Sequence, residues 1–274
     1  MPRAPGGRGR KPPVLKRFGQ HFLTDEKILT AIVDALAPTT SDTVVEVGPG
    51  RGSLTDILVE RAGWVIAIEI DRALAENLRD KYHTRSNVEI VEDDFLDVDL
   101  RAEAGRDCLL IGNVPYYITT PIIFKALEPP MPRRSVFLVQ REVAERMAAK
   151  AGDEAYGALT VNVAVVASVE QVLTVPATAF RPPPKVESAV VRLTPLEHSL
   201  VPADSLDSFR AFVQAAFGER RKQMQRVLRS VRRISADQAS AILERVGIEP
   251  TARPEVVAPE QFAKLFRVLH ENTT

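Results

Sequence analysis

Short apolar runs alternate with segments of helical periodicity through the first two thirds of the chain. Five of the runs are rich in β-branched residues and apolar on both faces, a pattern typical of buried parallel strands covered by helices. These runs occupy residues 43–47, 64–70, 87–91, 108–113 and 135–140. The pattern predicts an α/β fold with a mostly parallel sheet and helices on both of its faces.

Two later apolar runs, 169–175 and 186–193, flank the proline-rich segment PATAFRPPP. That connection is too short for a crossover helix, so we expect the two runs to form an antiparallel pair at one edge of the sheet. The predicted fold class of the larger part of the chain is therefore a Rossmann-like sheet with an antiparallel edge.

The sequence after Pro195 has helical periodicity only. Asp204 or Ser205 can cap a first helix, Ser235 can cap a later one, and Gly247 can end it. We therefore predict three segments. They are a disordered basic tail over residues 1–13, a cofactor-binding catalytic domain over 14–196 and a helical domain over 197–274.

A glycine-rich turn, Gly48-Pro49-Gly50-Arg51-Gly52, follows the first predicted strand. Glycines at a strand-to-helix turn let the backbone approach a ligand closely. Glu69 ends the second strand, twenty-one residues after Gly48, where its carboxylate can accept hydrogen bonds from both hydroxyls of a ribose. The third glycine comes one residue earlier than in a dinucleotide fingerprint, which favours S-adenosylmethionine. A dinucleotide enzyme and a merely structural turn stay open.

Two adjacent acids, Asp93 and Asp94, follow the third predicted strand. Asp94 stands where a carboxylate can accept a hydrogen bond from the adenine amino group of the cofactor, and Asp93 can exchange roles with it. Without the neighbouring motifs, the pair would be interpreted as a solvated acidic turn.

The fourth predicted strand ends in Asn113-Val114-Pro115-Tyr116, at the carboxyl edge where open α/β sheets bind ligands. An aromatic amine is a poor nucleophile because its lone pair is delocalised into the ring. The Asn113 side-chain oxygen and a backbone carbonyl held by Pro115, that of Val114, can accept its two N–H bonds and favour a pyramidal nitrogen. Tyr116 can stack on an extruded base, whereas Tyr117 is expected to pack inward. An ordinary turn after a strand is the alternative.

Cys108 is the only cysteine, which excludes a disulfide framework and a cysteine-rich zinc site within one chain. We expect no metal. Cys108 lies inside a predicted strand, so a core residue is favoured over a nucleophile for cytosine C5 methylation. No apolar run approaches the ~18 residues of a membrane helix, and the start of the chain lacks the apolar stretch of a signal peptide. These features favour a cytoplasmic protein with no membrane partner.

Basic residues are unevenly distributed, although the formal net charge is zero. The first eleven residues carry four basic residues and no acid, and residues 209–233 carry eight against one acid, Glu219. On a helix after Gly218, four basic residues would share one face opposite four apolar ones. The basic four are Lys222, Arg226, Arg229 and Arg233, and the apolar four are Phe217, Met224, Leu228 and Val231. This predicts a positive stripe for RNA phosphates, with a solvated charged face as the alternative.

Several segments together resemble one family, the ribosomal RNA adenine N6,N6-dimethyltransferases that modify the small subunit. The similar segments are RFGQHFL at 17–23, VEVGPGRGSLT at 45–55, IGNVPYYI at 111–118, FRPPPKVESAVVRL at 180–193 and AFGERRKQMQRVL at 216–228. The resemblance implies S-adenosyl-L-methionine as cofactor and 16S ribosomal RNA, in a small-subunit precursor, as partner. The implied acceptors are two adjacent adenosines in the 3′-terminal hairpin, each methylated twice.

The resemblance also implies a set of cofactor contacts. They fall on His21, Leu23, Gly48, Glu69, Asp94 and Asn113. His21 replaces the usual asparagine of the family, and Val114 replaces its usual leucine but keeps the backbone carbonyl. A histidine can become charged in mild acid, so we expect cofactor affinity to weaken there. Phe180, in the proline-rich loop, is interpreted either as the second face of a base sandwich with Tyr116 or as a buried loop anchor.

The leading interpretation is an enzyme that dimethylates adenosine in small-subunit ribosomal RNA and acts as a monomer. Three alternatives stay open. They are a large-subunit methylase of the macrolide-resistance type, an assembly factor with secondary methylation, and a dinucleotide oxidoreductase. The intact Asn-Val-Pro-Tyr loop favours chemistry over binding alone.

Overall fold

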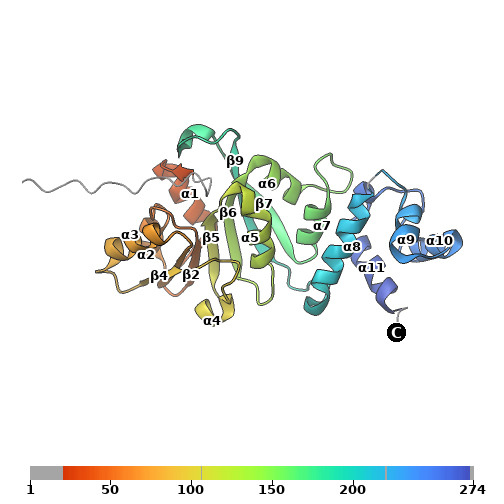
Figure 1. Cartoon of the computed structure of the whole chain (residues 1–274), viewed down its shortest axis with the longest axis horizontal. Coiled ribbons are helices and arrows are strands. Elements are labelled where there is room, and N and C mark those ends of the chain that lie inside the picture. Colours follow the sequence, from red (N-terminus) through yellow and green to blue (C-terminus); the bar gives the residue numbers. More distant parts are fainter. Residues whose placement is uncertain (1–20, 106, 220, 272–274) are drawn as a thin grey trace, which may run out of the picture.

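A seven-stranded mixed sheet forms the centre of the molecule, whose computed structural model describes residues 21–105, 107–219 and 221–271 (Figure 1). The strand order is β4-β3-β2-β5-β6-β9-β7, and the first five strands of that order run parallel. The strands are β2 (Thr43–Val47), β3 (Trp64–Glu69), β4 (Val88–Glu92), β5 (Leu109–Asn113), β6 (Arg134–Gln140), β7 (Ala167–Val175) and β9 (Ser188–Pro195). The predicted parallel sheet is confirmed.

The last two strands confirm the predicted antiparallel edge. β9 pairs antiparallel with β6, and β7 pairs antiparallel with β9 at the outside of the sheet. At the other end of the order, the chain goes from β2 outward through β3 and β4 and then returns to the opposite side of β2 at β5. Such a reversal opens a crevice at the carboxyl ends of the strands, and this crevice holds the site described below.

Helices cover both faces of the sheet because neighbouring strand residues point to opposite faces. Val44 and Leu109 pack with α1 and α2 on one face, whereas Val45 and Leu110 belong to a second apolar cluster with α5, α6 and α7 on the other. The helices of this part of the chain are α1 (Glu26–Leu36), α2 (Thr55–Arg61), α3 (Arg72–Tyr82), α4 (Leu100–Ala104), α5 (Thr119–Ala126), α6 (Arg141–Ala148) and α7 (Ala158–Ala164).

Short polar side chains cap several helices. Asp25, Asp71 and Asp99 each accept backbone N–H bonds in the first turn of α1, α3 and α4. The predicted cap at Ser235 is confirmed, because its hydroxyl accepts from the Gln238 N–H while the Gln238 side chain accepts from the Ser235 N–H.

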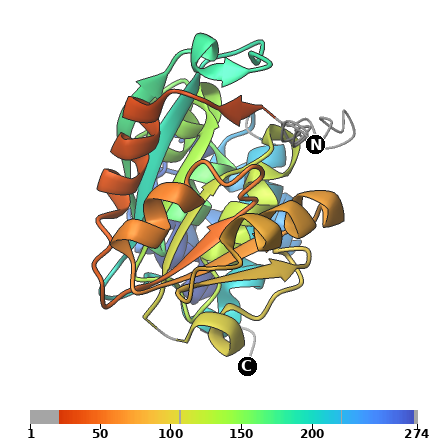
Figure 2. The same cartoon turned by 90° about the vertical axis from the view of Figure 1, so that its left-hand side faces the viewer.

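The chain after Pro195 is helical, as predicted. Figure 1 shows these helices at one end of the molecule, and Figure 2 shows them behind the sheet when it is viewed from the α2–α3 side. They are α8 (Leu206–Gly218), α9 (Met224–Arg232), α10 (Ala236–Arg245) and α11 (Pro259–Glu271). The Phe209 and Phe266 rings meet edge to face at 5.3 Å, and one apolar cluster continues from α7 into these helices. The predicted boundary at residues 196 and 197 stays a prediction, and the predicted tail over residues 1–13 lies outside the described residues.

A second, two-stranded sheet was not predicted from the sequence. β1 (Phe22–Leu23) pairs antiparallel with β8 (Phe180–Arg181), so that Leu23 lies opposite Phe180. The Thr24 N–H and hydroxyl both donate to the Ala179 carbonyl and extend this contact. The pairing brings the start of the described chain and the proline-rich loop to the mouth of the crevice.

Candidate active site

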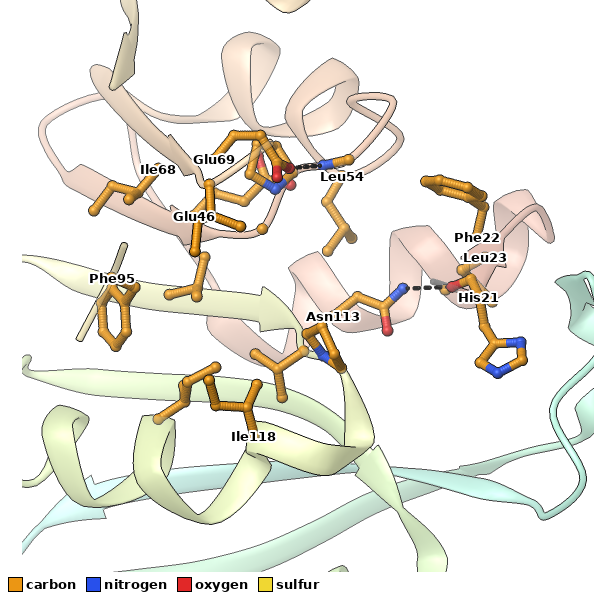
Figure 3. Close-up of a pocket in the computed structure, with 18 of the residues that line it drawn as sticks. His21, Phe22, Leu23, Glu46, Leu54, Ile68, Glu69, Phe95, Asn113 and Ile118 are labelled. Atoms are coloured by element: carbon orange, nitrogen blue, oxygen red, sulfur yellow. Dashed lines mark hydrogen bonds between the residues drawn. The ribbon is translucent and has the colours of Figure 1, made fainter. Parts of the chain in front are cut away.

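A pocket occupies the crevice at the carboxyl ends of β2, β3, β4 and β5 (Figure 3). Its volume, open mouth included, is about 1130 Å³, which is ample for a nucleoside-sized ligand. All six residues that the sequence assigned to the cofactor, Asn113 among them, line it, and so do Val114, Pro115 and Tyr116. The structure therefore brings the predicted cofactor loop and the predicted catalytic loop to one cavity.

The three glycines of the turn after β2 have different surroundings. Gly48, at a φ of +63°, has open space where a side chain would start, so the backbone is free to approach a ligand. At Gly50, an added Cβ would come within 3.0 Å of the Phe22 ring. At Gly52, it would come within 2.6 Å of the Tyr82 hydroxyl. The early third glycine is therefore required for the packing of α3, not for ligand contact.

Glu69 lies at the end of β3 and is 3% exposed. One of its carboxylate oxygens accepts from the Gly50 N–H at 2.9 Å, and the other accepts from the Asp71 N–H at 3.0 Å. These bonds fix the carboxylate against the glycine turn and leave further acceptor positions on both oxygens. Burial raises the pKa of Glu69, and the two backbone donors oppose that rise.

Glu46 is a pocket residue to which the sequence reasoning gave no role. It comes from the interior of β2, is 1% exposed, and accepts a 2.6 Å hydrogen bond from the Thr55 hydroxyl. Burial raises the pKa of Glu46 to about 8, and the nearby charge of Glu69 adds to the rise. The pocket thus contains a carboxyl that is mostly neutral at pH 7. Its signal in the sequence was a lone acid inside an otherwise apolar strand.

Both acids after β4 line the pocket. The Asp94 carboxylate accepts from the Leu96 N–H at 3.0 Å, and the Asp93 carboxylate accepts from the Asp94 N–H at 2.8 Å. These local bonds build a tight turn that presents both side chains at the same rim, so the choice between Asp93 and Asp94 stays open.

The catalytic loop is held by the segment around β1. The Asn113 side-chain NH₂ donates to the backbone carbonyl of His21 at 3.3 Å (Figure 3). A carbonyl can only accept, so this bond fixes which end of the amide is oxygen and leaves Oδ1 facing away from His21. Phe22 steadies the same segment, because its ring packs over Gly50 and the Arg51 guanidinium lies 4.4 Å from its centroid.

Two backbone carbonyls of the loop differ in their bonding. The Pro115 carbonyl accepts from the Ile118 N–H at 3.1 Å and from the Thr119 hydroxyl at 3.3 Å. Across the described chain, no donor reaches the Val114 carbonyl or Asn113 Oδ1. The loop therefore offers two free acceptors, the two that the sequence suggested.

The aromatic residues of the site depart from two predictions. Tyr116 is half-buried, and its hydroxyl is 2.5 Å from the Ser188 hydroxyl, which fixes the ring. Tyr117 was expected to pack inward, but it is 64% exposed at the pocket mouth because the loop continues as a 3₁₀ turn, η2 (Tyr116–Ile118). Phe180 is 0% exposed, so it cannot form the predicted second face of a base sandwich. Its pairing with Leu23 turns its ring into the core, and the buried-anchor alternative is correct.

The predicted basic stripe is shorter than expected. α9 begins at Met224 because Gln223 is extended, so Lys222 precedes the helix and pairs with Glu219 at 2.9 Å. Arg233 ends the helix in a left-handed conformation, and the predicted apolar residue Phe217 belongs to α8. Arg226, Arg229 and Arg233 are exposed, and none of them has an acidic partner among the described residues.

Arginines around the sheet behave differently from these three. Most of them pair with an acid, as in Arg61–Asp34, Arg79–Glu92, Arg85–Glu60 and Arg141–Glu187. Arg101, Arg146 and Arg181 also have no acidic partner among the described residues. What distinguishes Arg226, Arg229 and Arg233 is that three such exposed arginines lie within and at the end of one helix, an arrangement suited to phosphate.

Cys108 is buried, and burial raises the pKa of its thiol. It lies outside the pocket, which supports its interpretation as a core residue. Within the described ranges, no group of His, Cys, Asp and Glu side chains could hold a metal ion. No helix of those ranges is long and apolar enough to cross a bilayer.

Comparison with known proteins identifies the family. A family model described as ribosomal RNA adenine dimethylase matches residues 14–271. The chain belongs to the ribosomal RNA adenine dimethylase family. The match spans the sheet and the helical region alike, and it confirms the resemblance drawn from the motifs, including the expected class of enzyme, a ribosomal RNA methyltransferase.

Relatives that match over nearly the whole of both chains support this membership. Ribosomal RNA small subunit methyltransferase A of Acidobacterium capsulatum is 39% identical over 98% of this chain and 99% of its own length, and that of a Nostoc species is 41% identical over 93% and 97%. Among solved structures, a dimethyladenosine transferase from Plasmodium falciparum matches with a TM-score of 0.81 at 28% identity, covering 92% of this chain and 98% of the other. The 23S rRNA methyltransferase ErmE matches with a TM-score of 0.71 at 31% identity, covering 91% and 99%. The predicted methyltransferase fold is confirmed.

Proposed function

We propose that this chain transfers methyl groups from S-adenosylmethionine to the N6 amino group of adenosines in small-subunit ribosomal RNA. By family analogy, the acceptors are two adjacent adenosines in the 3′-terminal hairpin of 16S RNA, each methylated twice. The observation that carries the proposal is the pair of free acceptors, Asn113 Oδ1 and the Val114 carbonyl, beside the fixed ring of Tyr116. The names of the relatives support the small subunit over the large one.

The pocket fits the proposed cofactor. Open space above Gly48 admits a ligand close to the backbone, and the buried carboxylate of Glu69 suits a diol such as a ribose. The residues proposed to hold the cofactor are His21, Leu23, Gly48, Glu69, Asp94 and Asn113. When bound, S-adenosylmethionine supplies an electrophilic methyl group from its sulfonium. The expected loss of cofactor affinity in mild acid stays a prediction.

The two free acceptors explain how a weak nucleophile is activated. An adenine amino group has two N–H bonds, and donation of both to Asn113 Oδ1 and the Val114 carbonyl favours the pyramidal nitrogen that attacks. After one methyl transfer a single N–H remains, which either acceptor can orient for the second transfer. The nitrogen becomes positively charged as it takes the methyl group, and it then loses one proton to water. Because that proton is acidic once the nitrogen is charged, no strong base is needed, and the contribution of these residues is alignment and electrostatic stabilisation.

The RNA is proposed to meet the exposed arginines of α9. Arg226, Arg229 and Arg233 suit phosphate contacts that carry little base specificity, so recognition would come from the shape of the RNA and the extruded base. Tyr117, exposed at the pocket mouth, is available to the same RNA. A monomer in the cytoplasm, where small subunits assemble, is the proposed working form.

The test is methyl transfer in vitro with identification of the modified nucleoside. Labelled S-adenosylmethionine is offered with under-methylated small subunits, with protein-free 16S RNA and with large-subunit RNA, and the products are digested to nucleosides. We expect N6,N6-dimethyladenosine from small subunits, and a loss of about 100-fold or more in Asn113→Ala. Asn87→Ala is the matched control, because its amide also donates to a backbone carbonyl, that of Val59 at 2.9 Å, but lies outside the pocket.

Two results would contradict the proposal. Transfer to large-subunit RNA alone would assign the chain to the 23S-modifying enzymes. Tight binding to small subunits without any transfer would make it an assembly factor.

A further inference from the structure

Arg210 connects α8, the first of the C-terminal helices, to α5, the helix that follows the catalytic loop. Its guanidinium carbon lies 4.8 Å from the centroid of the Phe124 ring, and its Nη2 donates to the Phe124 carbonyl at 3.4 Å. The side chain is 17% exposed, and its acidic partner is Asp207, an exposed residue one turn earlier on α8, at 3.2 Å. One largely buried cation therefore contacts both the ring and the backbone of a residue in another helix.

α5 is continuous with the catalytic loop. It begins at Thr119, directly after the 3₁₀ turn η2, and the Thr119 hydroxyl donates back to the Pro115 carbonyl at 3.3 Å. Phe124 lies in the last turn of the same helix, where its carbonyl also accepts from the Leu127 N–H at 3.2 Å. A cation is favourable at this end of a helix because the backbone carbonyls there carry partial negative charge. Arg210 thus holds one end of a helix whose other end is bonded to the catalytic loop.

α8 also carries α9, the helix with the exposed arginines. The hydroxyl of Ser230 in α9 donates to the carboxylate of Glu219, directly after α8, at 3.4 Å. Met224 and Leu228 of α9 are buried in the apolar cluster that contains the buried face of α8. In Figure 1, α8 lies between the sheet and α9. Packed elements therefore connect the catalytic loop, through α5, Arg210 and α8, to the arginines of α9.

We propose that Arg210 is a positioning residue, which fixes the distance between the arginines of α9 and the catalytic loop. An RNA that contacts two surfaces binds the second one intramolecularly, with an effective concentration that is highest when the spacing of the surfaces matches the RNA. Arg210 lies outside the pocket, so it acts on the reaction through this spacing. The inference rests on the proposed function, because it concerns how the RNA of that reaction presents its extruded adenosine.

The experiment removes the two sides of the connection separately. Arg210→Gln removes the guanidinium, and Phe124→Leu removes the ring but keeps an apolar side chain and the backbone carbonyl. We expect kcat/KM for under-methylated small subunits, at saturating S-adenosylmethionine, to fall about 10-fold in each variant. The double variant should be no more impaired than either single one, because both substitutions break the same connection. The cofactor Kd, from calorimetry without RNA, should change less than about 2-fold, since neither residue lines the pocket.

A second background distinguishes positioning from a general effect on the fold. Arg210→Gln is repeated in a protein in which Arg226 and Arg229 are replaced by alanine. With the RNA contact of α9 weakened, its distance from the pocket matters less, so the fall caused by Arg210→Gln should shrink from about 10-fold to less than about 3-fold. A loss of catalytic-loop order or of folding would lower kcat/KM by the same factor in both backgrounds.

Arg134→Gln is the matched control. The Arg134 guanidinium donates to the carbonyl of Leu36, the last residue of α1, at 2.8 Å. This is the same kind of contact between an arginine and the end of a helix, but it joins β6 to α1 and not the sheet to the C-terminal helices. Its kcat/KM should stay within about 2-fold of the wild type. Thermal melting checks each variant, and Phe124→Leu, which keeps the guanidinium, carries the test if Arg210→Gln does not fold.

Three results would overturn the inference. One is an Arg210→Gln protein as active on small subunits as the wild type. Another is an equal loss with and without the two arginines of α9, and the third is a double variant whose loss is the product of the two single losses. If the wild type itself makes no methylated adenosine, the proposed function fails instead, so the two failures are distinguishable.

Discussion

Glu46→Gln tests the ionisation state of the buried carboxyl in the pocket. Burial raises the pKa of Glu46 from 4.5 to about 8, so the folded protein keeps this proton in a pH range where the unfolded chain loses it. The wild type therefore loses stability as pH rises from 4.5 towards 8. The difference between these two pKa values corresponds to roughly 5 kcal/mol as an upper limit. Glutamine cannot ionise, and its amide oxygen can still accept from the Thr55 hydroxyl.

We expect the unfolding free energy of Glu46→Gln, relative to wild type, to rise by roughly 3–5 kcal/mol between about pH 5 and pH 9. Urea denaturation of both proteins at a series of pH values measures this difference. The titratable groups that the wild type and the variant share contribute equally to both unfolding free energies, so their contributions cancel. Glu89→Gln, at an exposed carboxyl on strand β4 of the same sheet, is the control and should give a flat difference. A difference for Glu46→Gln that stays flat or falls with pH would mean that burial does not raise the pKa of Glu46.

The same neutral carboxyl predicts proton release when the proposed cofactor binds. S-adenosylmethionine is cationic at its sulfonium and ammonium groups, and a nearby cation lowers the pKa of a carboxyl. Binding at pH 7 should therefore release protons from the wild type, seen in calorimetry as an enthalpy that depends on the ionisation heat of the buffer. Glu46→Gln should release fewer, and equal release by both proteins would assign the proton to another group.

Two further predictions concern packing and RNA. Gly52→Ala places a Cβ 2.6 Å from the Tyr82 hydroxyl at a φ of +80°, whereas Gly105→Ala meets nothing within 4 Å at a φ of +76°. Denaturation should show Gly52→Ala less stable than Gly105→Ala by about 1–3 kcal/mol, and equal losses would remove the packing role. Joint replacement of Arg226 and Arg229 by alanine should weaken binding to small subunits and reduce the slope of log Kd against log salt by roughly 1.5. An unchanged slope would mean that neither arginine contacts phosphate.

The sequence was sufficient for the sheet and for the loops at its carboxyl edge. Apolar runs of strand length placed all seven strands to within two residues of their ends, because both faces of this sheet are buried and the pattern is strong. Glycines and an Asn-x-Pro-Tyr sequence directly after strands located the pocket, since the ends of parallel strands meet at one edge.

Side-chain directions outside the regular elements could not be predicted in the same way. Phe180 belongs to a two-residue strand, so the burial of its ring depends on the pairing with Leu23, far away in the sequence. Tyr117 lies in a short 3₁₀ turn, whose three residues per turn point neighbouring side chains in different directions. α9 was expected to begin before Met224, because the helical spacing of basic residues starts at Lys222. The backbone at Gln223 is extended, so Lys222 lies outside the helix. In each case the local pattern was compatible with two conformations, and tertiary contacts selected one.

We propose that this chain dimethylates adenosine through the two acceptors of its catalytic loop, Asn113 Oδ1 and the Val114 carbonyl. The most direct measurement is expression of the wild type and Asn113→Ala in a bacterial strain that lacks 16S adenosine dimethylation, followed by mapping of N6,N6-dimethyladenosine along 16S RNA. We expect the wild type to restore the modification at two adjacent adenosines near the 3′ end, and an equally abundant, folded Asn113→Ala protein not to restore it. Full modification by Asn113→Ala, or none by the folded wild type, would contradict it.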